Sequence, residues 1–192
     1  MKFPGILIMF ILLFFSASGQ QGYQVFYEKS LNNNTHAMMF LGGWAVANIV
    51  TGSIGWNNQQ GHTMRYHQMN VMWNVVNLSI AGVALYSNFT QDIAILSDEE
   101  MLNKHIRLEN ILLINAGLDV LYMGSGYWLT QRAKNGTKRA DMYKGYGQSM
   151  MLQGAFLFAF DLVFFAIKHK HRTNFLDNVQ PAAEGLGFRI VF

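Results

Sequence analysis

Four polar residues recur at helical spacing inside a stretch of the chain that is otherwise apolar enough to cross a bilayer. His67, Asn70, Asn74 and Asn77 are separated by three, four and three positions. On an α-helix they share an arc of roughly 80° on one face. Amide side chains in hydrocarbon cost free energy unless they are paired. This stripe is therefore expected to face other protein, a water-filled cavity or a ligand, although the residue types alone name no reaction.

A second polar stripe occurs in the third long apolar stretch. If this stretch is helical, one arc of about 60° around its axis contains Asn115, Asp119, Tyr122 and Gly126. A carboxylate inside a membrane is costly and suggests a function, and we expect Asn74 or Asn77 to be the partner of Asp119. A hydrogen bond that only joins two helices is the alternative role. The fourth apolar stretch adds Gln153 and Asp161.

Together these side chains predict a buried polar seam, which is the candidate binding site of the protein. Its expected members are His67, Asn70, Asn74, Asn77, Asn115, Asp119, Tyr122, Gln153 and Asp161. Polar side chains inside a membrane commonly mark the path or site of a proton, an ion or a small polar solute. The ligand itself is not indicated by the residue types.

Histidines at the ends of the apolar stretches suggest a second kind of site. His36, His105 and Glu109 are expected at one membrane surface, and imidazole is a ligand for zinc and for haem iron. His105 and Glu109 are also four positions apart, so they share a helix face. Histidines at membrane boundaries are commonly interfacial residues, however. No cofactor is therefore expected, and haem or a metal ion is the weaker alternative.

Serine, histidine and aspartate occur in the sequence, but the motifs typical of enzymes do not. The chain has no cysteine, which excludes disulfides, thiolate zinc sites and a cysteine nucleophile. No serine is flanked by the glycines of a nucleophile elbow. No glycine-rich pattern that binds phosphate precedes a lysine. An enzyme is therefore the least favoured class of protein.

The composition favours a membrane protein. Of the 192 residues 51% are hydrophobic and only 13% are charged, which is far on the apolar side of a soluble protein. The formal net charge is +3. The basic residues lie at the ends of apolar stretches rather than in a stripe that alternates with aromatics, so nucleic acid is not an expected partner.

Four stretches have the length that a transmembrane helix requires. They are residues 36–56, 69–87, 108–129 and 149–167. Residues 1–19 have the basic start, apolar run and small residues of a signal peptide, with an uncleaved signal anchor as the alternative. The predicted fold is thus all-α, a transmembrane four-helix bundle. It is preceded by an exported segment (20–35) and followed by an exported tail (169–192).

The four stretches form two similar pairs. Residues 52–56 at the end of the first stretch correspond to residues 124–128 at the end of the third. Tyr66 and Gln68 correspond to Tyr146 and Gln148. A repeated pair of helices keeps its orientation, so the bundle is predicted to consist of two related helical hairpins. Chance similarity between glycine-rich apolar helices is the alternative interpretation.

The charges between the stretches predict the orientation of the bundle. The connection between the third and fourth stretches is basic, whereas the connection between the second and third is mainly acidic. Basic connections stay in the cytoplasm, so the second connection and both ends of the chain are expected on the exported side. Lys168, Lys170 and Arg172 contradict this orientation because they follow the last stretch directly.

One set of residues resembles a known family. The set consists of the run Tyr66 to Asn70 with Trp73, Asn74 and Asn77, and of Gln153, Gly154 and Asp161. Over about residues 34–170 it is similar to an uncharacterised family of multi-pass integral membrane proteins of Bacteroidota. The resemblance implies a bacterial cell membrane as the location and brings no known activity.

Three functions agree with these patterns. A non-enzymatic binding or structural module of the membrane is the leading hypothesis. A small transporter or channel for a proton, an ion or a small polar solute is the second, and a haem or metal protein is the third. The lipid bilayer is the expected partner, and a second copy of the chain is a possible one because glycines and alanines favour close helix packing.

Overall fold

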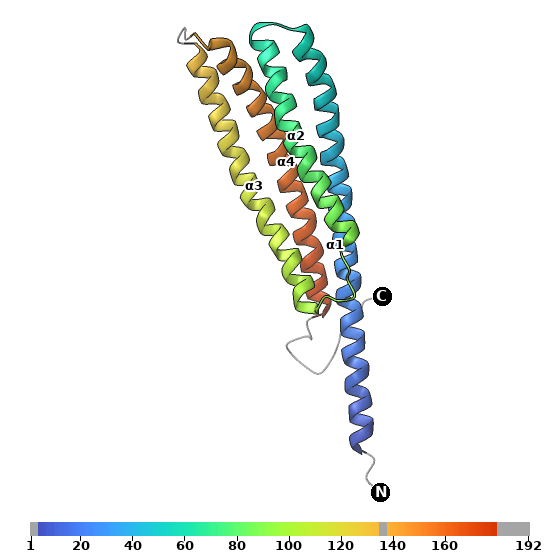
Figure 1. Ribbon diagram of the computed structural model, residues 1–192. Coiled ribbons are helices and arrows are strands. Elements are labelled where there is room, and N and C mark those ends of the chain that lie inside the picture. Colours follow the sequence, from blue (N-terminus) through green and yellow to red (C-terminus); the bar gives the residue numbers. More distant parts are fainter. Residues whose placement is uncertain (1–3, 135–137, 180–192) are drawn as a thin grey trace.

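The computed structural model describes the backbone of residues 4–134 and 138–179 and the side chains of residues 22–134 and 138–178. This part of the chain folds into one helical bundle (Figure 1). Its helices are α1 (Pro4–Asn58), α2 (Gly61–Thr90), α3 (Asp98–Ala133) and α4 (Ala140–Val179). The predicted all-α four-helix fold is confirmed, and no strand occurs among the described residues.

The ends of the helices follow from local chemistry. Gly61 begins α2 with a φ of +58°, a conformation that L residues with a side chain rarely adopt. At the start of α3, Ser97 Oγ accepts a hydrogen bond from the Glu100 amide, and the Glu100 carboxylate accepts one from the Ser97 amide at 2.8 Å. This capping box satisfies amides that the first helical turn leaves unpaired. The connections between the helices are short.

The helices are arranged as two hairpins that pack against each other. Helix α1 packs along α2, and α3 packs along α4, while α2 also lies against α4. At the end of the bundle where α1 continues beyond it, α1 also contacts α3 (Figure 1). Over the described residues the backbones of α2 and α3 do not come into contact. The space between α2 and α3 is therefore filled by side chains or left as a cavity.

Glycines allow α4 to approach both of its neighbours closely. A Cβ atom on Gly126 of α3 would lie 2.6 Å from the carbonyl oxygen of Gly147 in α4. A Cβ atom on Gly145 of α4 would lie 2.6 Å from the amide nitrogen of Tyr66 in α2. Both distances are far below van der Waals contact, so only glycine fits at these two crossings.

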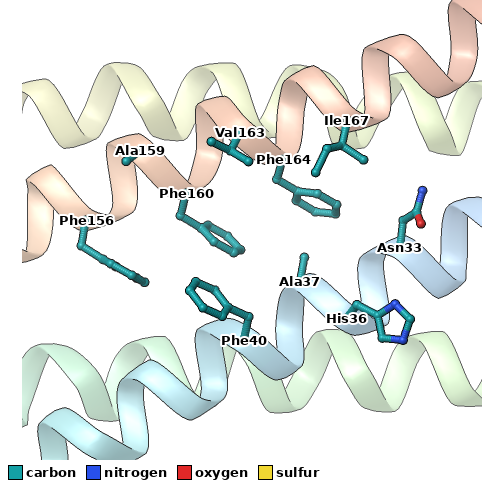
Figure 2. A pocket seen from close by; sticks show the side chains of 10 residues that line it. All are labelled: Asn33, His36, Ala37, Phe40, Phe156, Ala159, Phe160, Val163, Phe164 and Ile167. Carbon is teal, nitrogen blue, oxygen red and sulfur yellow. The ribbon is translucent and has the colours of Figure 1, made fainter.

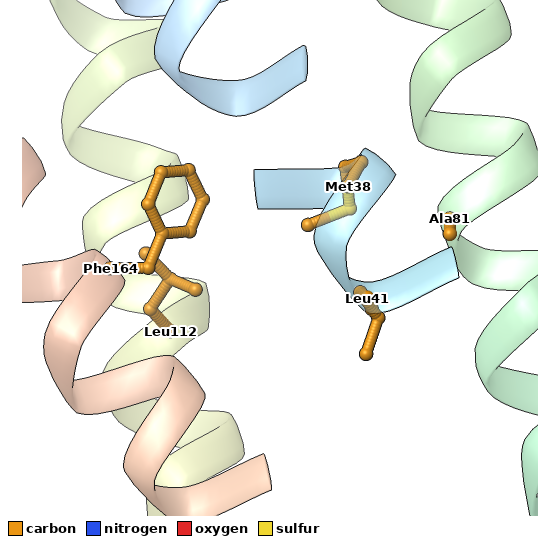
Figure 3. Packing of buried hydrophobic residues seen from close by; sticks show 5 residues of the cluster. All are labelled: Met38, Leu41, Ala81, Leu112 and Phe164. Carbon is orange, nitrogen blue, oxygen red and sulfur yellow. The ribbon is translucent and has the colours of Figure 1, made fainter. Parts of the chain in front are cut away.

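The bundle is apolar outside and partly polar inside. A small apolar core joins α1, α2, α3 and α4, and Figure 3 shows its five members: Met38, Leu41, Ala81, Leu112 and Phe164. Many other large apolar side chains are exposed, among them Val83, Ile114 and Leu121. Amide and carboxyl side chains are buried instead. A soluble protein rarely exposes so much apolar surface, whereas a bundle surrounded by lipid does.

Three segments are long and apolar enough to cross a membrane: Gly22–Asn58, Gly61–Thr90 and Ala140–Asn178. Helix α3, which contains the predicted span 108–129, is not among them. Its inward face carries polar residues such as Asn115 and Asp119, which lower its mean hydropathy. Its outward face is nevertheless apolar, with exposed Ile114 and Leu121.

Helix α1 is longer than the sequence predicts. The chain is already helical before residue 36, and Phe26 and Tyr27 are buried against Leu96 and Met101. Helix α4 likewise continues beyond residue 167, so that the rings of Phe26 and Phe175 stack at a centroid distance of 4.3 Å. Residues 1–3 of the predicted signal peptide and 180–192 of the predicted tail lie outside the described residues. The signal peptide and the exported tail remain predictions.

Candidate functional site

The asparagine stripe of α2 points into the bundle. The buried residues of α2 are Asn70, Asn74, Asn77 and Ala81, which recur every three or four positions along one face. Gln153 of α4 is fully buried opposite this face. The placement agrees with the expectation that these amides face other protein rather than lipid.

A chain of hydrogen bonds joins three helices around Asn70 and is called the amide network here. The side-chain nitrogen Asn70 Nδ2 donates to Asn48 Oδ1 at 2.9 Å, and Gln153 Nε2 donates to Asn70 Oδ1. Trp44 Nε1 donates to Gln153 Oε1 at 3.2 Å. Asn74 Nδ2 donates to the Asn70 carbonyl oxygen at 2.8 Å. In this half of the bundle, amides from α1, α2 and α4 thus bind one another directly.

A cavity lies next to the amide network, between α2 and α3. Its volume is about 460 Å³, and all four helices contribute to its wall. The polar residues of the wall are Asn34, Asn77, Asn115, Asp119, Tyr122 and Asp161. The remaining wall is aliphatic and aromatic. A mostly apolar cavity with a few convergent polar groups is typical of a small-molecule site.

Two carboxyl groups meet at this cavity. Asp119 of α3 and Asp161 of α4 are both buried, and their carboxyl oxygens lie within hydrogen-bonding distance of each other. The contact becomes a hydrogen bond only when one of the carboxyls carries a proton, because two carboxylates have no donor between them. Asp119 Oδ2 and Asn77 Nδ2 are buried and have no donor or acceptor among the described residues. The expected partner of Asp119 was Asn74 or Asn77; Asn74 bonds to Asn70 instead, and Asn77 Nδ2 and Asp119 Oδ2 form no hydrogen bond with each other.

A second polar cluster lies at the end of the bundle where α1 contacts α3. Ser30 Oγ lies 2.7 Å from His105 Nδ1, and the Lys168 ammonium donates to Ser30 Oγ at 2.8 Å. The Glu109 carboxylate forms a bidentate ion pair with Arg172, with hydrogen bonds of 2.9 Å from Nε and 3.0 Å from Nη2. These five residues are called the ionic cluster. They connect α1, α3 and α4.

His105 is neutral within the ionic cluster. Burial and the nearby Lys168 ammonium lower the pKa of His105 to about 4. Nδ1 of the neutral ring can therefore accept a hydrogen bond from the Ser30 hydroxyl, while Nε2 donates one to the Lys168 carbonyl oxygen at 3.1 Å. The unfolded chain takes up a proton on this histidine more readily than the folded chain does. The contribution of His105 to stability is consequently present at neutral pH and declines as the pH falls from about 6.5 toward 4.

The line of Ser30, His105 and Glu109 has the order of a catalytic triad but not its surroundings. Ser30 lies inside α1, so its own amide is used by the helix and cannot stabilise an oxyanion. Its Oγ already accepts a hydrogen bond from the Lys168 ammonium. The cluster therefore holds three helices together rather than presenting a nucleophile.

The structure brings most of the predicted seam together but separates the predicted metal ligands. Asn115 and Tyr122 line the cavity, and the ring of His67 lies at the edge of the seam against Gly55. His105 and Glu109 lie 3.2 Å apart. His36 lies elsewhere, in an apolar groove between α1 and α4 that is lined by phenylalanines (Figure 2). Among the described residues, no group of three or more histidines or carboxylates is placed to hold a metal ion.

Several residues of both polar regions were not found from the sequence. Trp44 and Asn48 are four positions apart in α1, which is the spacing that could have indicated a shared face with the α2 stripe. Lys168 follows Asp161 by seven positions and therefore lies on the same face of α4. Ser30 gave no signal because it lies in the segment predicted to precede the bundle.

The fold and the site define a helical bundle with an apolar exterior and a polar interior. The chain belongs to a family of unknown function, DUF6992, whose family model matches residues 40–162. This range contains the whole amide network and the Asp119–Asp161 pair, and it leaves Ser30, Lys168 and Arg172 outside. No curated protein and no solved structure matches the chain. The expected resemblance to an uncharacterised family is thereby confirmed, although neither the organism nor the membrane location follows from the match.

Proposed function

We propose that the protein is a multi-pass membrane protein that binds a small cation, or a small solute rich in N–H or O–H groups, in the cavity between α2 and α3. The observation that carries the proposal is the Asp119–Asp161 pair on the wall of a cavity of about 460 Å³. The proposed activity is binding, not catalysis. The proposed location is a bacterial cell membrane.

The chemistry of the carboxyl pair determines the class of ligand. Two adjacent carboxylates in apolar surroundings repel each other and lack solvation. A proton, a metal cation or an ammonium group between them removes both costs. Asn77 and Asn115 add amide groups to the same wall, which can orient the ligand through hydrogen bonds.

The cavity shares part of its wall with a second pocket at one end of the bundle. This pocket near the α2–α3 connection shares Asn34, Leu108 and Ile111 with the cavity wall. Toward the opposite end, the amide network fills the bundle with direct hydrogen bonds. Access to the cavity through the amide network is therefore not expected while these hydrogen bonds are formed.

A transporter is the second candidate, and one observation favours it. Polar side chains continue from the cavity through Asn74, Asn70 and Gln153 toward the far end of the bundle. A ligand could pass only if the amide network opened, so Gln153 would act as a gate residue. The distinction between the two candidates is therefore whether the amide network ever admits water.

The ionic cluster supports the exported orientation of both ends of the chain. Lys168 and Arg172 contradict that orientation when they are counted as basic residues after a span. In the structure both are engaged inside the bundle, Lys168 with Ser30 and Arg172 with Glu109. Residues held inside the bundle do not belong to a flanking loop, which is what the positive-inside rule counts, so they weigh less against this orientation.

The proposed binding can be tested by the thermal stability of the detergent-solubilised protein. The probes are sodium, potassium and methylammonium chlorides, with choline chloride as the control for ionic strength. A ligand that binds only the folded state raises the melting temperature as its concentration exceeds Kd. We expect at least one probe to raise it, and we expect Asp119→Asn together with Asp161→Asn to abolish the rise. Equal melting temperatures in all four salts for the unmodified chain would overturn the proposal for cations of this size.

A further inference from the structure

The pocket near the α2–α3 connection has a different chemistry from the cavity. It has a volume of about 280 Å³ and is enclosed by parts of α1, α2, α3 and α4. Its polar lining includes Ser30, Asn34, Asn88, Lys104, Arg107 and Lys168, and no carboxylate lines it. Three positive side chains therefore surround one small pocket.

The charges of the exposed cations are not neutralised within the pocket. Lys104 Nζ donates to the neutral Gln91 amide at 2.6 Å. Neither Lys104 nor Arg107 forms an ion pair with any described residue. The nearby acidic residues accept hydrogen bonds from backbone amides instead: Asp92 from the Ala94 amide, and Glu100 from the Ser97 amide. Both cations are thus available to a ligand.

The buried cation is also undercompensated. Lys168 is only 1% exposed, and its ammonium donates to two neutral acceptors, the carbonyl oxygen and Oγ of Ser30. The ammonium also lies 5.4 Å from the Phe164 ring centroid, and because it has three hydrogens, one remains for an oxygen acceptor. Glu109, the carboxylate of the ionic cluster, is already bound by Arg172. A buried charge without a counter-ion is costly, and an anion in the pocket would supply one.

We propose that this pocket binds a phosphate group, presented either by an anionic lipid headgroup or by free phosphate. Arginine and lysine donate charge-assisted hydrogen bonds to phosphate oxygens, and amides such as Asn88 can add further donors. The pocket lies at the end of the apolar part of the bundle, where headgroups of a surrounding bilayer lie. Directly beyond Arg107, the exposed side chains of Ile111, Ile114 and Leu118 extend along α3, where an acyl chain could pack. This inference is independent of the cation site and uses none of its carboxyls.

The experiment compares two sources of phosphate with the full-length protein. Protein in nanodiscs of phosphatidylglycerol or phosphatidylcholine is extracted and weighed by native mass spectrometry to detect retained lipid. Inorganic phosphate, with chloride as the control, is titrated against the melting temperature of the lipid-free protein. We expect retained phosphatidylglycerol but not phosphatidylcholine if the source is a lipid, and a phosphate-specific rise if the source is free phosphate. Failure of both arms would overturn the proposal.

Paired variants separate the pocket from the general positive charge of this end. Lys104→Gln with Arg107→Gln removes two exposed cations of the pocket, and we expect it to weaken binding by about tenfold or more. Lys29→Gln with Lys170→Gln removes two exposed cations outside the pocket and should leave binding unchanged. Because all four residues are exposed, both variants should fold. Equal loss of binding in the two variants would show unspecific attraction and would contradict the proposed site.

Discussion

Replacing Glu109 by glutamine is expected to lower the free energy of unfolding by about 3 kcal/mol. The carboxylate is only 3% exposed. It accepts two hydrogen bonds from the Arg172 guanidinium and lies 3.2 Å from His105 Nε2. Glutamine keeps the shape but removes the negative charge, so Arg172 loses its counter-ion and Lys168 its nearest anion. The effect is placed at the lower end of the range for buried pairs because Arg172 itself is partly solvated. Denaturant titration in mixed micelles measures it.

A double variant shows whether the loss comes from the broken pair. Glu109→Gln combined with Arg172→Gln removes both charges, and we expect it to be more stable than Glu109→Gln alone. Glu28→Gln changes an exposed carboxylate of α1 and should alter stability by less than about 0.5 kcal/mol. If Glu109→Gln is no more harmful than Glu28→Gln, the ionic cluster does not hold the helices together.

Replacing Gly147 by alanine is expected to cost about 2 kcal/mol. A Cβ atom at this position would collide with the Gly126 carbonyl oxygen, and it would lie 3.0 Å from the Thr130 amide nitrogen. Both neighbours are backbone atoms of α3, so α3 and α4 must move apart. Overpacking of this kind costs about 3 kcal/mol at the upper end of its range, and alanine returns about 1 kcal/mol through its helix propensity.

Gly124 of α3, the helix against which Gly147 packs, provides the matched control. A Cβ atom at Gly124 would have no neighbour within 4 Å. Gly124→Ala should therefore stabilise the protein, by up to about 1 kcal/mol, through helix propensity alone. The two glycine variants are thus expected to shift the unfolding midpoint in opposite directions. Equal shifts would mean that α3 and α4 do not approach each other at Gly126 and Gly147.

Periodicity predicted which residues share a helix face, but not which faces meet. The spacing of Asn70, Asn74 and Asn77 was sufficient to place them on the buried face of α2. It could not show that Asn70 bonds to Asn48 and Gln153, since helix rotation and axial register are set by packing across helices. For the same reason the spacing could not show that Asp119 of α3 meets Asp161 of α4.

Charged residues at the helix ends were the least predictable part of the structure. Lys168 was interpreted as a topological signal because it follows an apolar stretch, yet it is among the most buried side chains. His105 and Glu109 were placed on one face by their spacing, and this is where the structure has them. Their partners come from α1 and from the end of α4. Composition assigned those two segments to the flanks of the bundle, so the ionic cluster could not be anticipated.

If the cavity between α2 and α3 is a binding site, water reaches Asn77 on its wall but not Asn74 in the amide network. The chain has no cysteine, so single cysteines can be introduced at Asn77, Asn74 and the outward-facing Val83. The protein is then treated in membranes with a membrane-impermeant thiol reagent. We predict that Asn77→Cys reacts, whereas Asn74→Cys and Val83→Cys are protected. Reaction at both asparagine positions would favour the transporter, and complete protection of Asn77→Cys would contradict a water-accessible binding site between α2 and α3.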